Sequence, residues 1–349
     1  MSYNIVRYCR KFTLANTFVL LCLASNGQYN FSGLDKFFIG QKKSFGNDFA
    51  ALIYKDGKII YQKETEEFKI KSKAMVSGSS QWLTAALVMT FVDEGIITLD
   101  DRISTYLPIF ETYGKSYITI RQCLSHQTGI EDNQKLVARM LQRKKFESLE
   151  EEVNSFAKRE IAANPGTTFN YGGIGPSIAG RVLEIVSKRR FELLAKQRLF
   201  TPLNMRNTTF IPEENSTNPA SGAGSTAADY LNFLTMLLNK GMFMGKRVLS
   251  EAAVIEMQTI QTGKAAIKYQ PEATIGYQYG LGTWIIPGSP DNNKNTLSAG
   301  GNFGTIAYLD QCKNYAAIVL PMKLQGEQSN SLQNEMRKLA DTQMPANCQ

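Results

Sequence analysis

The residues that could most readily take part in a reaction are serines at the start of an apolar, helix-like segment. Ser77, Ser79 and Ser80 precede the run that begins at Trp82. A serine nucleophile that is activated by lysine needs the lysine three residues later, because side chains at i and i+3 share one face of a helix. No serine of this group has a lysine at that spacing. The segment therefore does not predict a serine–lysine pair.

Two neighbouring positions have the spacing without the chemistry. Gly78 and Gln81 are three residues apart at the start of the same segment. Glycine has no side chain that can attack a substrate, and the glutamine amide does not take up a proton near neutral pH. We expect Ser77 or Ser79 to cap the helix rather than to react.

Other reactive side chains are few. One Ser-x-x-Lys match, Ser155 to Lys158, lies in a charged stretch before the loop at Pro165, and so short a match arises easily by chance. His126 is the only histidine, and we expect it to be a hydrogen-bonded structural residue. With one histidine and no Cys/His cluster, neither a metal site nor another cofactor is expected.

The first 27 residues are typical of an export signal. Three basic residues precede an apolar run from Phe12 to Ala24, which is shorter than the roughly 20 residues that a membrane-spanning helix needs. We predict cleavage after Ala24 or after Gly27, with an uncleaved amphipathic start as the alternative. The mature protein would then be periplasmic or extracellular, without a transmembrane span.

Charge and cysteines narrow the partners and the redox chemistry. Removal of the signal would lower the formal net charge from +8 to +5, because the signal has three basic residues and no acidic one. This charge is dispersed and no nucleic-acid-binding motif accompanies it, so a nucleic-acid partner is not predicted. Cys123 is expected to be a buried thiol, whereas Cys312 and Cys348 could form a disulfide.

Turn and periodicity signals mark the elements at the front of the chain. Residues 49–54 and 58–62 are predicted strands on either side of a turn at Asp56–Gly57. Helical spacing of apolar residues runs from Trp82 to Glu94 and ends at Gly95.

Strand signals return near the end of the chain, after a mostly helical stretch from about 119 to 260. This order predicts an α+β fold in a single domain, residues 28–349. The antiparallel sheet lobe would come from both termini, about 46–70 and 265–345. The helical lobe, about 75–260, would be inserted between them.

Several segments resemble one family in their order and spacing. Besides 76–89, they are Phe91–Asp101, Tyr106–Pro108, Ile118–Ile130, Pro165–Tyr171, Leu199–Met205, Ser225–Asp229 and Tyr279–Gly282. Over roughly residues 47 to 340, the chain resembles the serine β-lactamase and penicillin-binding-protein superfamily, in its class C and esterase-like branch. The resemblance implies the β-lactamase/transpeptidase-like fold.

The resemblance also implies which residues stand at the catalytic positions. In the family, the serine of Ser-x-x-Lys forms an acyl-enzyme, the lysine activates it, and backbone amides form an oxyanion hole. Here those positions are Gly78 and Gln81. Loss of a serine nucleophile costs on the order of a million-fold in turnover. The bare glycine would also widen the floor of the cleft.

Two further motifs of the family are incomplete. Tyr-x-Asn corresponds to 171–173, so Tyr171 is retained and the asparagine is Gly173. Lys-Thr-Gly or His-x-Gly corresponds to 298–300, so the basic residue is Ser298 and Gly300 is retained. Tyr171 is expected to be a buried structural residue or a ligand contact.

We derive three hypotheses from this pattern. The first is an exported, catalytically inactive homologue whose cleft binds a small amide, ester, peptide or cell-wall fragment through Gly78, Gln81, Tyr171, Ser298 and Gly300. The second is an active serine hydrolase of the β-lactamase, D-Ala-D-Ala carboxypeptidase or esterase type, with chemistry rewired to Tyr171, Ser79 or Ser80. The third is a structural or protein-interaction scaffold. The sequence does not decide the oligomeric state.

Overall fold

The computed structural model of the chain describes residues 29–132, 146–210, 216–287, 296–299, 305–323 and 330–345. The predicted export signal lies outside these ranges, and so does Gly300. Within the described ranges, no helix is both long enough and apolar enough to cross a bilayer.

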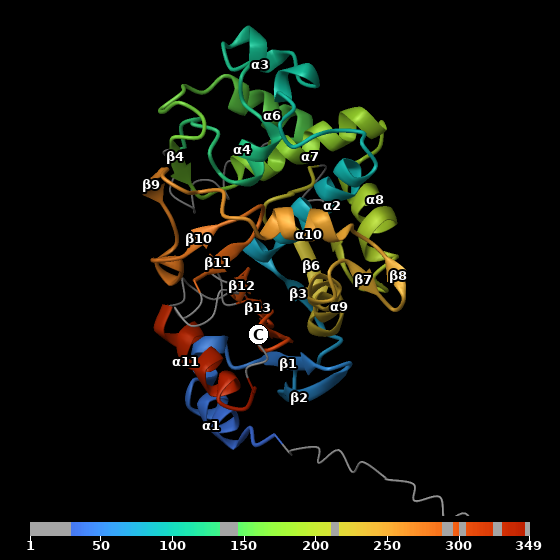
Figure 1. Cartoon of the computed structure of the whole chain (residues 1–349), viewed down its shortest axis with the longest axis vertical. Coiled ribbons are helices and arrows are strands. Elements are labelled where there is room, and N and C mark those ends of the chain that lie inside the picture. The colour runs from blue at the N-terminus through green and yellow to red at the C-terminus, as the bar shows by residue number, and fades with distance from the viewer. Residues whose placement is uncertain are drawn as a thin grey trace, which may run out of the picture.

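A seven-stranded antiparallel sheet joins the two ends of the chain (Figure 1). In spatial order its strands are β10 (Gln278–Tyr279), β11 (Trp284–Ile286), β12 (Thr296–Ser298), β13 (Ile306–Asp310), β14 (Tyr315–Pro321), β1 (Phe49–Lys55) and β2 (Lys58–Glu64). The junction is the antiparallel pairing of β1 with β14, in which Phe49 lies opposite Pro321. The predicted sheet from both termini is confirmed.

The first hairpin forms where the turn signal predicts it. Asp56 and Gly57 separate β1 from β2, and both have positive φ, 48° and 85°. Asp-Gly suits such a turn, because both residues tolerate the left-handed region better than branched ones do. Most of β1 is buried, as expected of a central strand, whereas β2 is partly exposed at the edge of the sheet.

Helices cover both faces of the sheet. The helices in the described residues are α1 (Ser32–Gly40), α2 (Ser80–Asp93), α3 (Ile109–Thr112), α4 (Ile120–Leu124), α6 (Leu149–Ala157), α7 (Ile174–Ser187), α8 (Phe191–Ala195), α9 (Ala227–Leu238), α10 (Glu251–Gln258) and α11 (Asn330–Asp341). The first and the last, α1 and α11, lie side by side on one face (Figure 1). On the other face, α9 packs against β1, β13 and β14.

The side chains of β1 divide between two cores, because neighbouring residues of a strand point to opposite faces. Ala50 and Leu52 belong to the large core that the helical lobe shares. Phe49, Ala51 and Ile53 belong to the smaller core beneath α1 and α11. The alternation therefore fixes the register of this strand between two helical layers.

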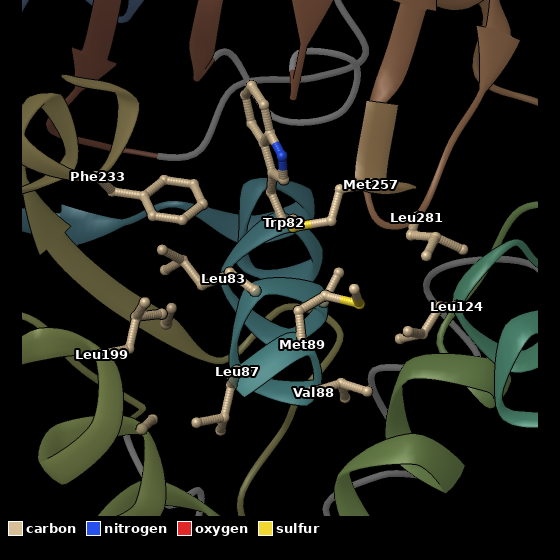
Figure 2. Packing of buried hydrophobic residues seen from close by; sticks show 14 of the residues in the cluster. Trp82, Leu83, Leu87, Val88, Met89, Leu124, Leu199, Phe233, Met257 and Leu281 are labelled. Atoms are coloured by element: carbon tan, nitrogen blue, oxygen red, sulfur yellow. The ribbon is translucent and has the colours of Figure 1, made fainter. Parts of the chain in front are cut away.

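The central helix of the large core is α2, and it carries the residues on which the site depends. Every residue from Ser80 to Phe91 is buried. Figure 2 shows its apolar side chains spreading to several neighbours, with Trp82 near Phe233 and Met257. The Trp82 and Phe233 rings meet edge to face, with centroids 5.7 Å apart. A helix buried on all sides is held in place by its packing, so its first turn has a fixed position.

The middle of the chain contains more strand than the sequence predicts. The short strands within residues 119–260 are β4 (Thr168–Asn170), β5 (Thr209–Phe210), β6 (Ala223–Thr226), β7 (Met242–Phe243) and β8 (Lys246–Arg247). Two of them pair with strands outside this region, β3 (Lys73–Met75) and β9 (Ala266–Tyr269). They form a three-stranded sheet and two two-stranded sheets. Strands of two to four residues leave almost no periodic signal, which is why they read as loops.

Short helical turns complete the described elements. Those of the 3₁₀ type are Lys42–Phe45, Ser77–Ser79, Ile103–Thr105 and Glu272–Thr274, and a π-helical turn spans Lys196–Phe200. The prediction that Cys123 is a buried thiol is confirmed. Cys123 is a buried free thiol, and burial raises its pKa. Cys312 is in a disulfide, and its predicted partner Cys348 lies outside the described residues.

Candidate functional site

The first turn of α2 begins at a strained backbone position. Strand β3 pairs with β6 and leads into the 3₁₀ turn Ser77–Ser79, which continues directly into α2. Ser77 has φ 47°, in the left-handed region, which costs a non-glycine residue about 1–2 kcal/mol. The backbone N–H of Val76 donates to the carbonyl of Ala223 and fixes the entry to the turn. Gly78 is therefore held at a defined place by both of its flanks.

Tyr171 fills the space beside Gly78. A Cβ atom on Gly78 would lie 2.8 Å from the Tyr171 Oη, closer than real Cβ atoms approach their neighbours. The Tyr171 ring is buried against His126 and Trp284, with centroids 4.8 Å and 5.1 Å away. The expectation that glycine widens the cleft floor is therefore wrong, because the tyrosine hydroxyl takes up the room.

Both ends of the Gln81 amide form hydrogen bonds with buried neighbours. Its Oε1 accepts hydrogen bonds from His126 Nε2 at 2.8 Å and from the Tyr279 hydroxyl at 2.9 Å. Its Nε2 donates to the carbonyl of Gly172 at 3.3 Å. Gln81, His126 and Tyr279 are each at most 4 % exposed. The residue in the place of the family's lysine is thus a fixed member of a buried polar network.

The network also assigns the tautomer of His126. The backbone N–H of Gly172 donates to His126 Nδ1 at 3.4 Å, so Nδ1 is the acceptor and Nε2 carries the proton. Nε2–H points to the Gln81 Oε1 and, at 3.1 Å, to the Tyr279 hydroxyl. Burial raises the pKa of Tyr279 well above its ordinary value, with Tyr171 and Tyr230 adding to the effect. The three hydrogen-bond partners of Gln81 are therefore neutral, and Gln81 itself cannot act as a base.

The serines next to Gly78 are engaged in structural hydrogen bonds. The Ser79 hydroxyl donates to the Ala299 carbonyl at 2.9 Å. The Ser80 hydroxyl accepts from the backbone N–H of Ala223 at 3.0 Å. The prediction that Ser77 or Ser79 caps the helix is wrong, because Ser79, the N-cap residue of α2, has helical φ and ψ and makes no capping bond. Its hydroxyl instead ties α2 to the residue after β12.

The remaining predicted positions lie on two different elements. Ser298 is buried at the end of β12, opposite Trp284, and its carbonyl accepts from the Thr283 hydroxyl at 3.1 Å. Gly173 is the N-cap of α7, and a Cβ there would meet only the Ala220 Cβ, at 3.5 Å. The structure thus brings Gly78, Gln81 and Tyr171 together and places β12 beside the start of α2.

The lone Ser-x-x-Lys match is unrelated to this site. Ser155 lies on α6, and its hydroxyl donates to the Glu152 carbonyl at 2.6 Å in the same helix. In the parts of the chain that the structure describes, no group of three His, Cys, Asp or Glu side chains could hold a metal ion.

Sequence reasoning missed the role of Tyr279. This tyrosine was one residue of a segment that resembled the family, and its contact with Gln81, 198 positions earlier, has no local signal. The sequence predicts that the single histidine is a hydrogen-bonded structural residue. It is indeed hydrogen-bonded, with φ 58°, but it contacts the site directly through Gln81.

A substitution at Gly78 tests the contact with Tyr171. We expect Gly78→Ala to lower the free energy of unfolding by about 1–3 kcal/mol, because the added methyl group meets the Tyr171 Oη in a packed site. Combined with Tyr171→Phe, which removes that oxygen, the same substitution should cost markedly less. Denaturant unfolding of the four proteins of this cycle measures the coupling.

Gly173→Ala is the matched control for that cycle. Its Cβ has only an ordinary contact, and φ is −93°, so the change should be neutral or slightly stabilising. Equal costs for Gly78→Ala with and without the tyrosine hydroxyl would show that Tyr171 does not fill this space.

The fold and the site together define the class of protein. A buried helix whose first turn faces a tyrosine-bearing loop, beside an antiparallel sheet from both termini, is a serine-hydrolase architecture. The chain belongs to the beta-lactamase family, whose model matches residues 49–342. The family resemblance inferred from the sequence is confirmed.

Solved structures share the fold at low sequence identity. A protein from Bacteroides dorei DSM 17855, provisionally classed as a beta-lactamase, has a TM-score of 0.78 and 23% identity, covering 90% of this chain and 99% of its own. An octameric penicillin-binding protein homologue from Pyrococcus abyssi has a TM-score of 0.67 and 20% identity, covering 89% and 76%. These similarities establish the α+β β-lactamase/transpeptidase-like fold.

Curated relatives match over part of their length. Penicillin-binding protein 4 of Amycolatopsis lactamdurans is 28% identical over 207 residues, which are 50% of this chain and 53% of that protein. Beta-lactamase-like protein 4 of Dictyostelium discoideum is 26% identical over 209 residues, 52% of this chain and 36% of that protein. The chain thus spans about half, or less, of the curated relatives it matches.

Proposed function

We propose that this protein is a catalytically inactive member of the beta-lactamase family that binds a ligand in the cleft of the fold. The observation that carries the proposal is the state of Gln81. Its amide accepts two hydrogen bonds and donates one, all with neutral partners, and an amide does not take up a proton, so position 81 cannot activate a nucleophile. Gly78, three residues earlier, supplies no nucleophile to activate.

The hydroxyls nearest to Gly78 do not replace the missing pair. Those of Ser79 and Ser80 are buried. The first donates to the Ala299 carbonyl, and the second accepts from the Ala223 N–H in β6. Tyr171 is close to Gly78, but the adjacent imidazole directs its only N–H toward Gln81 and its acceptor nitrogen toward Gly172. The ring of His126 is therefore committed on both nitrogens and does not serve as a base for Tyr171.

The ligand class follows from what the family fold presents. A bound carbonyl or carboxylate would meet the first turn of α2 and the phenol of Tyr171, which donate hydrogen bonds but do not form covalent bonds. A small amide, ester, peptide or cell-wall fragment fits this chemistry. The proposal includes export after cleavage of residues 1–27 and a single domain over residues 28–349. Mass analysis of the secreted protein would locate the new N-terminus.

Covalent probes test the loss of catalysis. We expect neither a fluorescent penicillin nor a fluorophosphonate to label the wild-type protein, and nitrocefin and p-nitrophenyl esters to be hydrolysed no faster than in buffer. Intact-mass spectrometry after incubation with each probe detects any adduct. A labelled serine, or ester turnover that disappears in Tyr171→Phe, would establish the rewired hydrolase instead.

A further inference from the structure

A pocket lies beside the Gln81 network, and its lining does not include Gly78, Gln81 or Ser298. Its volume is about 230 Å³, and His126 and Gly172 form the part of its wall nearest to the network. Strand β4 explains the separation. Phe169 and Tyr171 join the aromatic cluster around Trp284, whereas Thr168 and Asn170 line the pocket. Alternate residues of a strand face opposite sides, so the pocket and the aromatic cluster lie on opposite sides of β4.

The wall of this pocket contains a buried carboxylate. The Asp132 side chain is 4 % exposed and forms an ion pair with Arg159, whose Nη1 is 3.6 Å from the Asp132 Oδ1. Because a carboxylate has about four lone-pair sites, a ligand cation at Asp132 would share the carboxylate with Arg159. Thr128, 6 % exposed, adds a second buried polar side chain to the same wall.

Other residues of the lining contribute positive charge and apolar surface. Lys268 and Ile267 come from β9, whose four residues are all exposed, so both lie at the open rim. Ile130 and Ile174 are buried and line the interior. The pocket therefore combines an internal carboxylate, an apolar body and a cation at its mouth.

We propose that this pocket binds an amino acid or a dipeptide with free termini. The ammonium group would lie at Asp132, the carboxylate at Lys268, and a branched apolar side chain against Ile130 and Ile174. The volume is below the roughly 300–1,000 Å³ of drug-sized ligand pockets, which suits a molecule of this size rather than a nucleotide cofactor. Because Asp132 repels anions, phosphate-rich ligands are also disfavoured.

Calorimetric titration with glycyl-valine tests the site. We expect a Kd below about 1 mM for the dipeptide. Blocking the ammonium group, in N-acetylglycyl-valine, should weaken binding at least tenfold, because it removes a charge-assisted hydrogen bond to a buried carboxylate. Blocking the carboxylate, in glycyl-valinamide, should weaken it by no more than about fivefold, since ion pairs at an exposed rim contribute little.

Variants identify the pocket as the place of binding. Asp132→Asn should weaken glycyl-valine binding at least tenfold. Lys268→Met should lower the affinity for glycyl-valine to the level that the wild type has for glycyl-valinamide. The affinity for glycyl-valinamide should not change. Lys264→Met, an exposed lysine just before the same strand, is the matched control and should bind like the wild type. Because Lys268 is exposed, its variant remains informative even if Asp132→Asn fails to fold.

Two results would overturn the proposal. One is the absence of binding heat up to about 10 mM dipeptide. The other is equal affinity for glycyl-valine and its N-acetyl form. Neither result bears on catalysis at Gly78, because the pocket does not include that residue, so this inference and the proposed loss of activity are tested separately.

Discussion

The double variant Gly78→Ser with Gln81→Lys is expected to acquire a covalent fluorophosphonate adduct at position 78, which the wild type does not form. The backbone that presents position 78 is fixed by Ser77 and by the bond from Val76 to Ala223, so a new hydroxyl would appear where the family has its nucleophile. Removal of such a nucleophile costs on the order of a million-fold, so its return should be easy to detect. Peptide mapping of the labelled protein locates the adduct.

The surroundings of Gln81 determine how fast that variant reacts. An amine at position 81 would face the N–H of His126, a donor, and the carbonyl of Gly172, an acceptor. A donor opposite the amine favours its uncharged form, which is the form that can remove a proton. At position 78 the new side chain must displace the Tyr171 hydroxyl, so labelling should be slower than in an intact family enzyme.

Single variants supply the controls for this experiment. Gly78→Ser alone should label far more slowly than the double variant, because Gln81 cannot activate the hydroxyl. Gln81→Lys alone should not label at all. A double variant that unfolds cooperatively yet carries no adduct at position 78 would show that the site has lost more than these two side chains.

Gln81→Met is expected to lower the free energy of unfolding by about 2–4 kcal/mol. Methionine has a similar length, but it cannot accept from His126 and Tyr279 or donate to Gly172. These polar groups are buried, and each one left without a partner costs about 1–3 kcal/mol. The His126–Tyr279 contact at 3.1 Å would recover part of the loss, which keeps the total below the sum. Urea unfolding at constant pH measures the change.

Gln62→Met is the matched control for the second prediction. Gln62 lies on β2 with an exposed side chain, so its replacement should change stability by no more than about 0.5 kcal/mol. If both variants were equally stable, the hydrogen bonds of Gln81 would have no net structural value. The glutamine at position 81 would then not be required for the stability of the fold.

The fold could be predicted because its signals are local and agree with one another. The Asp56–Gly57 turn, the helical run that ends at Gly95 and the late strands each follow from a few neighbouring residues. The absence of a nucleophile and a base is also a property of residue identity alone. Gly78 and Gln81 show it without coordinates.

The interior of the site could not be predicted, because it depends on packing between distant segments. Tyr171 was recognised, but the position of its hydroxyl against Gly78 depends on how α2 and the loop after β4 are placed. The Gln81 network joins residues 45 and 198 positions apart in the chain. The pocket beside Asp132 requires β9, a strand of four residues that reads as loop.

The pairing of β1 with β14 inside the sheet has a kinetic consequence. A bond such as that from Lys55 Nζ to the Lys313 carbonyl spans 258 positions, so the sheet cannot close before β14 has been synthesised. Topologies dominated by such distant contacts fold slowly. A truncation just upstream of Tyr315 would remove β14 and leave both cores incomplete.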